Sequence, residues 1–363
     1  MTMTMASRPV RWVLHVDMDQ FLVAVELLRR PELIGLPVVV GGRGDPTERA
    51  VVSTASYEAR AFGVRSGVAL KLAKKRCPEA VFLPVDFPHY EAASTTVMAA
   101  LRAMPGAVVQ VLGWDEAFVG FEVDGSVDPM DLADAAREAV RAESGLSCSV
   151  GVGDTLVRAK TATGFGKPAG TYRLTRDNWL AVMGERDTQS LWGVGPRIAA
   201  RLADLGIGTV AQLADATVES LVAEFGKVGG HHVSSLGRGE GRSWPDDSPW
   251  VARAHGRETT YQRDLETRDQ VADGVLELSQ RVVEDVAADT AGVPDGEPAG
   301  RKVARVFLKV RFKPFFTYQR SRKLAAPTSD PTVVAATALA LYDALQDPRP
   351  VRLLGVRGEM TDP

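Results

Sequence analysis

The stretch HVDMDQFLVAVE, from His15 to Glu26, decides the fold. Apolar residues alternate through the strand-like run that leads to Asp17 and Asp19, and a segment compatible with a helix follows from Phe21. Strand side chains two residues apart point to one face, so both aspartates can look out from a sheet edge toward a metal-bound phosphate. A solvated turn is the alternative, because helices commonly begin near acidic residues.

The composition is that of an ordinary globular chain. Its 363 residues allow two or more domains, with 45% hydrophobic and 25% charged residues. No run approaches a membrane-spanning helix, and the first ten residues lack the apolar core of a signal peptide, so we expect a cytoplasmic protein. Cys77 and Cys148 are too few for a disulfide framework or a thiolate metal site. The net charge of −3 argues only weakly against a nucleic-acid partner.

A second acidic centre lies at Asp115 and Glu116, between strand-like runs at 108–112 and 117–123. Adjacent strand residues face opposite ways, so these two acids share a site only if the chain turns or bulges, which Gly113 favours. Together with Asp17 they form an oxygen-ligand set suited to Mg²⁺ or Mn²⁺, and we expect no His or Cys beside them to recruit zinc. Two such ions can hold the attacking and the leaving oxygen of a phosphoryl transfer.

A candidate phosphate-binding pair of residues lies between the two acidic centres in the sequence. Tyr57 and Arg60 are three residues apart, hence on one helical face, where a hydroxyl and a guanidinium can hold the same phosphate oxygens. An ordinary surface helix explains the same spacing. Short strands are predicted just before it, at 37–42 and 50–53.

The charge is concentrated near the C-terminus, where residues 301–323 hold nine basic residues and no acidic one. Alternation places Val306, Leu308, Val310 and Phe312 on the face toward a helix and sends Arg305, Lys309 and Arg311 to the other face, toward phosphates. A solvated sheet face is the alternative. The remaining pattern predicts helices at 90–104, 128–143, 156–163, 267–288 and 332–345, strands at 81–84, 148–152, 253–261 and 351–360, and a loop at 289–300.

Several of these stretches, in this order, resemble the motifs of the Y-family translesion DNA polymerases, and especially their DinB or polymerase IV branch. The similarity extends over nearly the whole chain. The stretches are HVDMDQF (15–21), STASYEAR with AFGVRSG (53–67), DEAF (115–118), SVGVGDTLVRAKTATGFGKPAG (149–170) and LWGVGPRIAARLADLGIGTVAQL (191–213).

The resemblance implies an α+β multidomain right-hand polymerase. Its parts are a palm with a largely antiparallel sheet (1–26 and 79–176), small fingers (27–78), a helical thumb with a helix-hairpin-helix (177–241), a linker (242–250) and a little finger of two helices and four strands (251–363). In the thumb, Gly193 and Gly195 let backbone amides approach a DNA phosphate, and Arg197 can add a cation. A generic helical hairpin is the alternative.

The resemblance also assigns residues to the site. Asp17, Asp115 and Glu116 correspond to catalytic carboxylates and metal ligands, and Met18 to a backbone-carbonyl ligand of the two Mg²⁺ or Mn²⁺ ions. Asp19 corresponds to an aspartate that is not normally a ligand, so the strand-face argument alone overrates it. The triphosphate-binding positions are the amides of Phe21 and Leu22, with Thr54, Tyr57, Arg60 and Lys167.

Two departures from the family pattern matter. Leu22 stands where an aromatic ring usually abuts C2′ of the incoming sugar, so we expect poor discrimination between ribo- and deoxyribonucleotides. Backbone placement that keeps this sugar gate closed is the alternative. Gly113 and Trp114 replace a serine and a small aliphatic residue before Asp115, which puts contacts to the primer terminus in doubt.

The predicted function is low-fidelity, template-directed extension of a primer with dNTPs, and also with rNTPs through the open sugar gate at Leu22. The predicted partner is primer–template DNA, with no membrane. No clamp-binding tail follows Met360, so we expect action without a sliding clamp, and a monomer. Two other functions fit parts of the sequence. An inert DNA-binding relative would lack part of the acidic triad, and a metal-dependent nuclease would not need Tyr57, Arg60 and Lys167.

Overall fold

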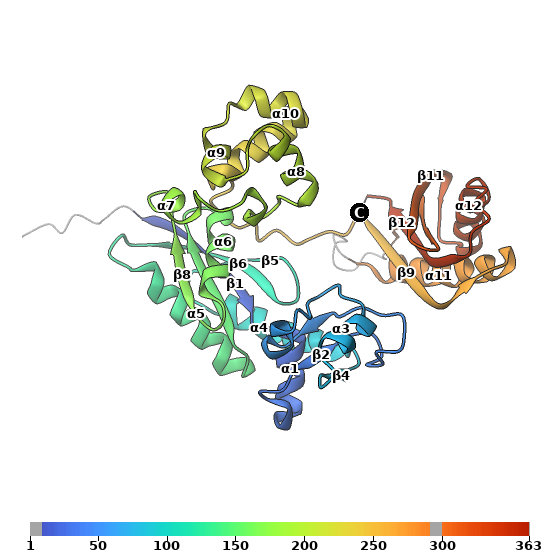
Figure 1. Ribbon diagram of the computed structural model, residues 1–363, viewed down its shortest axis with the longest axis horizontal. Helices are drawn as coiled ribbons and strands as arrows, with labels where there is room; N and C mark the ends of the chain where they lie inside the picture. Colours follow the sequence, from blue (N-terminus) through green and yellow to red (C-terminus); the bar gives the residue numbers. More distant parts are fainter. Residues whose placement is uncertain (1–8, 291–299, 363) are drawn as a thin grey trace, which may run out of the picture. The chain divides into compact units, whose positions relative to one another are not determined.

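The computed structural model describes residues 9–290 and 300–362, which form two compact units (Figure 1). The larger unit holds most of the chain up to Asp247. The smaller holds the chain from Ser248 together with two short segments, 45–51 and 68–75. Most of the loop predicted at 289–300 lies outside the described residues. No helix in the described ranges is both long and apolar enough for a membrane span.

A five-stranded sheet forms the centre of the larger unit, with strand order β5-β6-β1-β7-β8. Only β7 and β8 pair in parallel, so the predicted, largely antiparallel sheet is observed. The strands are β1 (Val10–Met18), β5 (Val108–Val111), β6 (Glu116–Val123), β7 (Cys148–Gly153) and β8 (Thr171–Leu174).

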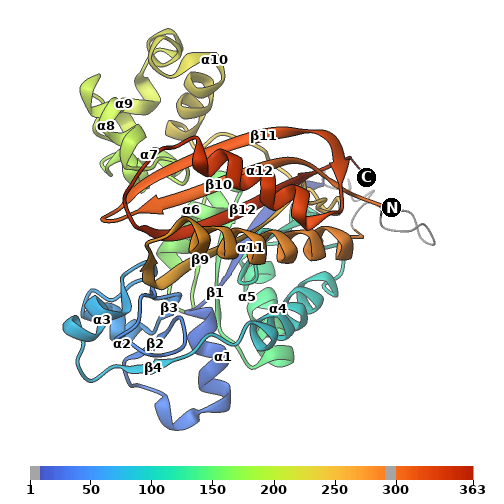
Figure 2. The same ribbon diagram turned by 90° about the vertical axis from the view of Figure 1, so that its right-hand side faces the viewer.

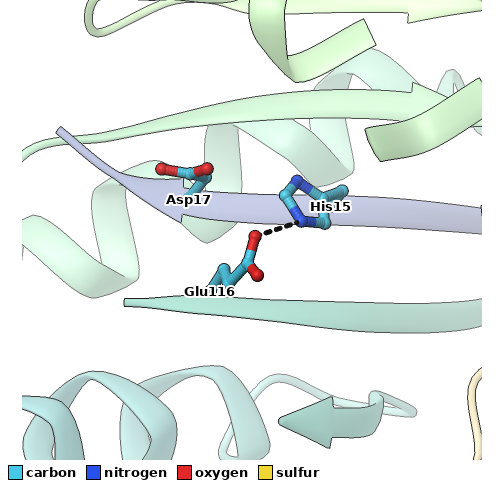
Figure 3. Close-up of side chains that lie close together, drawn as sticks. All are labelled: His15, Asp17 and Glu116. Atoms are coloured by element: carbon cyan, nitrogen blue, oxygen red, sulfur yellow. Dashed lines mark hydrogen bonds and ion pairs between the residues drawn. The ribbon is translucent and has the colours of Figure 1, made fainter. Parts of the chain in front are cut away.

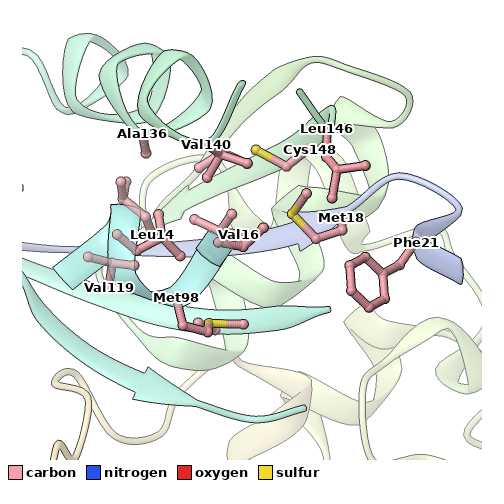
Figure 4. Close-up of a cluster of buried hydrophobic side chains, with 14 of the residues drawn as sticks. Leu14, Val16, Met18, Phe21, Met98, Val119, Ala136, Val140, Leu146 and Cys148 are labelled. Carbon is pink, nitrogen blue, oxygen red and sulfur yellow. The ribbon is translucent and has the colours of Figure 1, made fainter. Parts of the chain in front are cut away.

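The two faces of this sheet are covered differently because the side chains of β1 alternate. Leu14, Val16 and Met18 point into the main core, which Figure 4 shows between the sheet and the residues of α5 (Pro129–Ser144) and α4 (Phe87–Arg102). Val13 on the opposite face packs against α6 (Leu156–Gly166). His15 and Asp17 share that second face, which leaves the two polar side chains outside the main core.

Helix α6 packs closely on β7 because glycines face it. A Cβ on Gly151 would lie only 2.0 Å from the carbonyl oxygen of Ala159, so no other residue fits there without displacing the helix. The first turn of α6 is also held by a distant segment. The Thr155 hydroxyl donates to the carbonyl of Gly239 at 2.8 Å, and the amide of Leu156 donates to the carbonyl of Arg242 at 2.9 Å.

A small sheet with order β3-β2-β4 and short helices follow the first helix, α1 (Phe21–Arg29). Its strands are β2 (Val38–Val40), β3 (Thr54–Ala55) and β4 (Val81–Leu83), and the helices are α2 (Tyr57–Ala61) and α3 (Leu70–Arg76). The strand predicted at 50–53 was wrong. Thr54 and Ala55 pair with β2 instead, whereas exposed Val51 makes only an isolated bridge to Ala69.

The chain from about Asp177 is helical, as predicted. Its helices are α7 (Trp179–Met183), α8 (Pro196–Asp204), α9 (Val210–Asp215) and α10 (Val218–Gly237). The segment after them packs back on the large sheet. Arg11 lies over the ring of Trp244 with 5.0 Å to the centroid, and Asp246 donates its amide to Gln110.

The smaller unit contains a four-stranded antiparallel sheet of order β11-β10-β12-β9, with two helices side by side on one face (Figure 2). The elements are β9 (Ala254–Leu265), α11 (Arg268–Ala288), β10 (Val303–Phe312), β11 (Phe316–Thr328), α12 (Pro331–Asp343) and β12 (Val351–Met360). The predicted two helices and four strands are therefore all present. Segment 45–51 packs on β9, where Arg49 donates to Asp264 and to the carbonyl of Tyr261.

A matched pair of glycines tests the packing of α6. Gly151→Ala forces a methyl group into the Ala159 carbonyl and should lower the free energy of unfolding by about 1–3 kcal/mol or more. Gly164→Ala, in α6 itself and with open space around it, should instead raise the free energy of unfolding by about 0.5–1 kcal/mol. Urea unfolding followed by circular dichroism measures both, and equal effects would contradict the close packing.

Candidate active site

Two carboxylates face each other where β1 ends and β6 begins. Asp17 and Glu116 are direct partners in the antiparallel register of these strands. Among the described residues, His15, Asp17 and Glu116 each offer one ligand atom within 4.8 Å of the others, and Figure 3 shows them at this strand pair. Like charges directly opposite each other repel, so this arrangement needs positive charge nearby.

Two lysines supply that charge. Lys167, just beyond the last residue of α6, forms an ion pair with Asp17, and Lys160 on α6 forms one with Glu116. A hydrogen bond from His15 is the largest cause that lowers the pKa of Glu116, to about 2, and Lys160 adds to it. Glu116 is therefore held as a carboxylate.

His15 corrects one sequence prediction, because an imidazole does lie beside the carboxylates. Its ring is almost fully buried, and this burial lowers its pKa, so it is held neutral. Nε2 lies 3.1 Å from Glu116 and Nδ1 lies 2.8 Å from the Thr163 hydroxyl. Because an ionised carboxylate only accepts, we place the ring proton on Nε2, where it donates to Glu116. With both nitrogens engaged, His15 orients Glu116 more readily than it binds a metal.

Asp115 lies in the turn between β5 and β6, outside the compact group of three. Its carbonyl accepts from the amide of Met18 at 2.8 Å, which ties the turn to β1. Burial, and then the charge of Asp17, raise the pKa of Asp115, so its carboxylate is within electrostatic reach of Asp17. A Cβ at position 113 would lie 3.4 Å from Oδ1 of Asp115, an ordinary contact, so the space beside this carboxylate does not itself require glycine. Trp114 turns to the side and makes an edge contact with Phe87.

Strand periodicity predicted that Asp19 would face outward beside Asp17. Asp19 is instead buried, and its carboxylate is engaged in hydrogen bonds within the protein. Its carboxylate accepts hydrogen bonds from Tyr57, Ser147, Ser149 and the amide of Ala169. This carboxylate joins β1 to α2, to β7 and to the loop after α6. Its role in the described chain is structural.

Of the predicted triphosphate-binding residues, Lys167 forms the ion pair with Asp17, and the others lie in α1, β3 and α2. Helix α1 begins at Phe21 with no side-chain cap, so the amides of Phe21 and Leu22 have no partner within the helix. Arg60 lies 4.8 Å from the ring centroid of Tyr57, whose hydroxyl donates to Asp19, and Thr54 lies in β3 just before them. Burial and then Asp19 raise the pKa of Tyr57, so it stays a protonated donor.

Leu22 is half-buried on the first turn of α1 and packs against the edge of the main core. Phe21 beside it is buried, so the aromatic ring of this dipeptide points inward while the aliphatic side chain stays partly accessible. The position predicted as the sugar gate therefore carries a short, flexible side chain.

A cavity of about 650 Å³ opens beside Lys160. Lys160 lies 5.3 Å from the ring centroid of Trp192, and Arg186 lies 4.5 Å from that of Phe165, so cations and aromatic rings line the same space. Such a combination suits the phosphates and bases of a nucleic acid.

The predicted DNA contacts of the helical segment are exposed. Gly193 has φ of 95°, a conformation that favours glycine, and Gly195 is the N-cap of α8. Arg197 follows in the first turn of α8, and both glycines and Arg197 lie at the surface while Val194 between the glycines is buried. The geometry leaves these backbone amides open to a phosphate.

The predicted basic face lies on β10 in the smaller unit. Val306, Leu308, Val310 and Phe312 are buried under the helices, as alternation predicted. On the opposite face, however, Lys309 pairs with Glu258 at 2.6 Å and Arg305 with Glu359 at 3.4 Å. Arg311 donates to the hydroxyl of Thr317 at 2.9 Å. The acids come from β9 and β12, so the basic run alone overstated the free positive charge.

Sequence reasoning missed His15, Lys160, Thr163 and Trp192 around Glu116. For two of these residues, the spacing from a predicted site residue in the sequence indicates that they lie on the same side. His15 is two residues before Asp17 on one strand, and Lys160 is seven residues before Lys167, two helical turns along α6. No local pattern placed Trp192 near this helix.

The comparisons with known proteins agree with this architecture. The impB/mucB/samB family model matches residues 16–164, and the model of that family's C-terminal domain matches residues 252–359. The chain therefore belongs to the impB/mucB/samB family of Y-family DNA polymerases.

Among its relatives are two proteins named DNA polymerase IV 2, from Mycobacterium bovis and Mycobacterium tuberculosis. Each is 47% identical over 98% of this chain and 100% of the relative. A DNA polymerase IV from Methanoculleus marisnigri is 37% identical over 97% of this chain and 95% of the relative.

A solved structure, the Y-family DNA polymerase chimera Dbh-Dpo4(243-245)-Dbh, matches the fold with a TM-score of 0.80 at 21% identity. The match covers 96% of this chain and 98% of that one. The predicted family and right-hand polymerase fold are thus confirmed, and with them the enzyme class, a DNA-directed DNA polymerase.

The lowered pKa of Glu116 predicts a pH dependence of stability. A carboxylate whose folded pKa lies below its ordinary value of 4.5 stabilises the fold above that value and loses the contribution as pH falls toward about 2. With a chelator present, wild type should therefore lose more free energy of unfolding between about pH 4.5 and pH 2 than Glu116→Gln. Urea unfolding across this range checks it, and parallel losses in both chains would contradict it.

Proposed function

We propose that this chain extends a primer along a DNA template by two-metal nucleotidyl transfer, with low fidelity and tolerance for damaged templates. The observation that carries the proposal is the meeting of Asp17 and Glu116 across β1 and β6, with Asp115 in the adjoining turn and Lys167 alongside. The proposed palm, fingers, thumb, linker and little finger keep the boundaries predicted from the sequence. We further propose that the protein acts as a monomer in the cytoplasm, without a sliding clamp.

The side chains fit two divalent cations. Asp17, Asp115 and Glu116 would hold them with the carbonyl of Met18, and hard oxygen ligands favour Mg²⁺ or Mn²⁺. The fit rests on the raised pKa of Asp115 beside Asp17 and on the lysines that balance Asp17 and Glu116, since both features mark excess negative charge. When bound, the ions supply positive charge for the attacking and leaving oxygens.

Other residues of the chain would orient the carboxylates and bind the substrates. His15 and Lys160 hold Glu116 ionised and oriented, as the lowered pKa of Glu116 indicates. The open amides of Phe21 and Leu22 at the start of α1, with Arg60 and Lys167, would bind the triphosphate of the incoming nucleotide. The cavity beside Lys160 would receive the end of the primer strand, with the amides at Gly193 and Gly195 gripping its backbone.

Low fidelity is consistent with the small size of the predicted fingers. Their described core is the three-stranded sheet of β2, β3 and β4, in strands of two or three residues, with the short α2. So small a module has little surface to contact a nascent base pair. The shape of the base pair then contributes little to the selection of the correct nucleotide.

Primer extension tests the proposal. Wild type should add nucleotides to a recessed primer in the presence of Mg²⁺ or Mn²⁺, and Asp115→Ala should reduce the rate by about a thousandfold or more, since removal of one such stabilising group costs several kcal/mol. Glu138→Ala, an exposed acid on α5, is the matched control and should extend normally. A nuclease would shorten the primer, and an inert relative would bind it unchanged; either result rejects the proposal.

Leu22 predicts weak sugar discrimination. Wild type should add a ribonucleotide nearly as well as a deoxyribonucleotide, and Leu22→Phe should raise the preference for the deoxyribonucleotide by about 10–200-fold, the range that a steric contact in a pocket provides. Leu28→Phe, an exposed position on the same helix, should change nothing. Single-nucleotide kinetics measure the ratio. Strong rejection of ribonucleotides by wild type would refute an open gate.

A further inference from the structure

The turn between β10 and β11 has an unusual sequence. Turns of this kind normally carry Gly, Asn or Asp, yet this one reads Lys-Pro-Phe and is followed by a second phenylalanine. Phe315 is 65% exposed and Phe316 is 54% exposed. Two large aromatic side chains at a hairpin tip are costly to leave in water, which indicates a binding role for at least one of them.

The two rings lie on different sides of the hairpin. Phe316 is the cross-strand partner of Phe312, which is buried in the core under the helices, so Phe316 lies at the rim of that core. Phe315 instead lies beside Arg311, whose guanidinium carbon is 5.8 Å from the ring centroid. Arg311 belongs to the solvent face of β10, with Arg305 and Lys309, so Phe315 ends that basic face.

Cations crowd around Phe315. Arg352 lies 4.9 Å from its ring centroid, and the hydrogen bond to Thr317 holds Arg311 in place. Burial lowers the pKa of Arg352, and the neighbouring positive charge of Arg49 lowers it further. The charge of Asp264 acts in the opposite direction on Arg352, but Asp264 is already bound by Arg49. An anion placed here would therefore relieve repulsion among the arginines.

We propose that Phe315, Arg311 and Arg352 form a binding site for an unpaired nucleotide of the template strand. The base stacks on the ring of Phe315, and its phosphate oxygens accept hydrogen bonds from the two guanidiniums. A base joined to a phosphate supplies both features that the site can bind, an aromatic face for Phe315 and an anion for the two arginines. The inference rests on the proposed function, since the unpaired nucleotides of a primer–template all belong to the template ahead of the primer end.

Binding of the full-length chain to two DNA duplexes tests the site. One duplex is blunt, and the other has a 5′ overhang of about six nucleotides, within the usual site size. Wild type should prefer the overhang, and Phe315→Ser should lose that preference, by between about five- and a hundredfold in affinity. Phe315→Trp should retain it. Fluorescence anisotropy measures the affinities, and quenching of 2-aminopurine in the overhang reports stacking.

Phe316→Ser is the matched control, because Phe316 is an adjacent, similarly exposed ring that also lies beside an arginine, with Arg349 at 4.1 Å. It should keep both the overhang preference and the quenching. The proposal is overturned if wild type shows no preference, if Phe315→Ser keeps it, or if Phe316→Ser loses as much. Primer extension by wild type is scored separately, so failure of the proposed function is distinguished from failure of this site.

Discussion

Repulsion between Asp17 and Glu116 is the constraint on which the larger unit depends. Register fixes the two carboxylates opposite each other at the end of a strand pair, where like charges repel. The fold resolves this with positive charge brought from far along the sequence. Lys160 and Lys167 belong to α6 and its C-cap, and the buried core of β1 holds the acids in place against them.

The two units of the chain carry opposite charges at the surfaces that we expect to bind DNA or nucleotides. The larger carries the acidic strand ends, which repel the phosphates of DNA unless cations intervene. The smaller carries the basic face of β10, in which part of the charge is already balanced by Glu258 and Glu359. A net charge of −3 for the whole chain averages over both and describes neither. Strand-level charge patterns were the better guide to a nucleic-acid partner.

Much of the fold could be predicted from the sequence where one face of an element is buried. The alternation in β10 assigned its core residues correctly, and the predicted bounds of β12 agree with the structure. The strand at 50–53 was misplaced because apolar residues alone do not fix pairing. Val51 is exposed, and the partners of β2 are Thr54 and Ala55. The acidic residues could be proposed from the sequence because they lie next to strand ends. Of the groups around them, Lys167 was predicted, whereas Lys160, Thr163 and Trp192 were not. These residues, like the acids of β9 and β12 that pair with the basic face, meet their partners only through tertiary contacts.

Helix α6 is about 16 Å long, at 1.5 Å per residue, and connects two distant parts of the larger unit. One end is fastened to the carbonyls of Gly239 and Arg242 beyond α10, and the other end holds Lys167 against Asp17. Because Gly151 has no Cβ, the helix lies directly on β7. The same helix therefore connects the segment after α10 to the ammonium groups of Lys160 and Lys167, which pair with the acids.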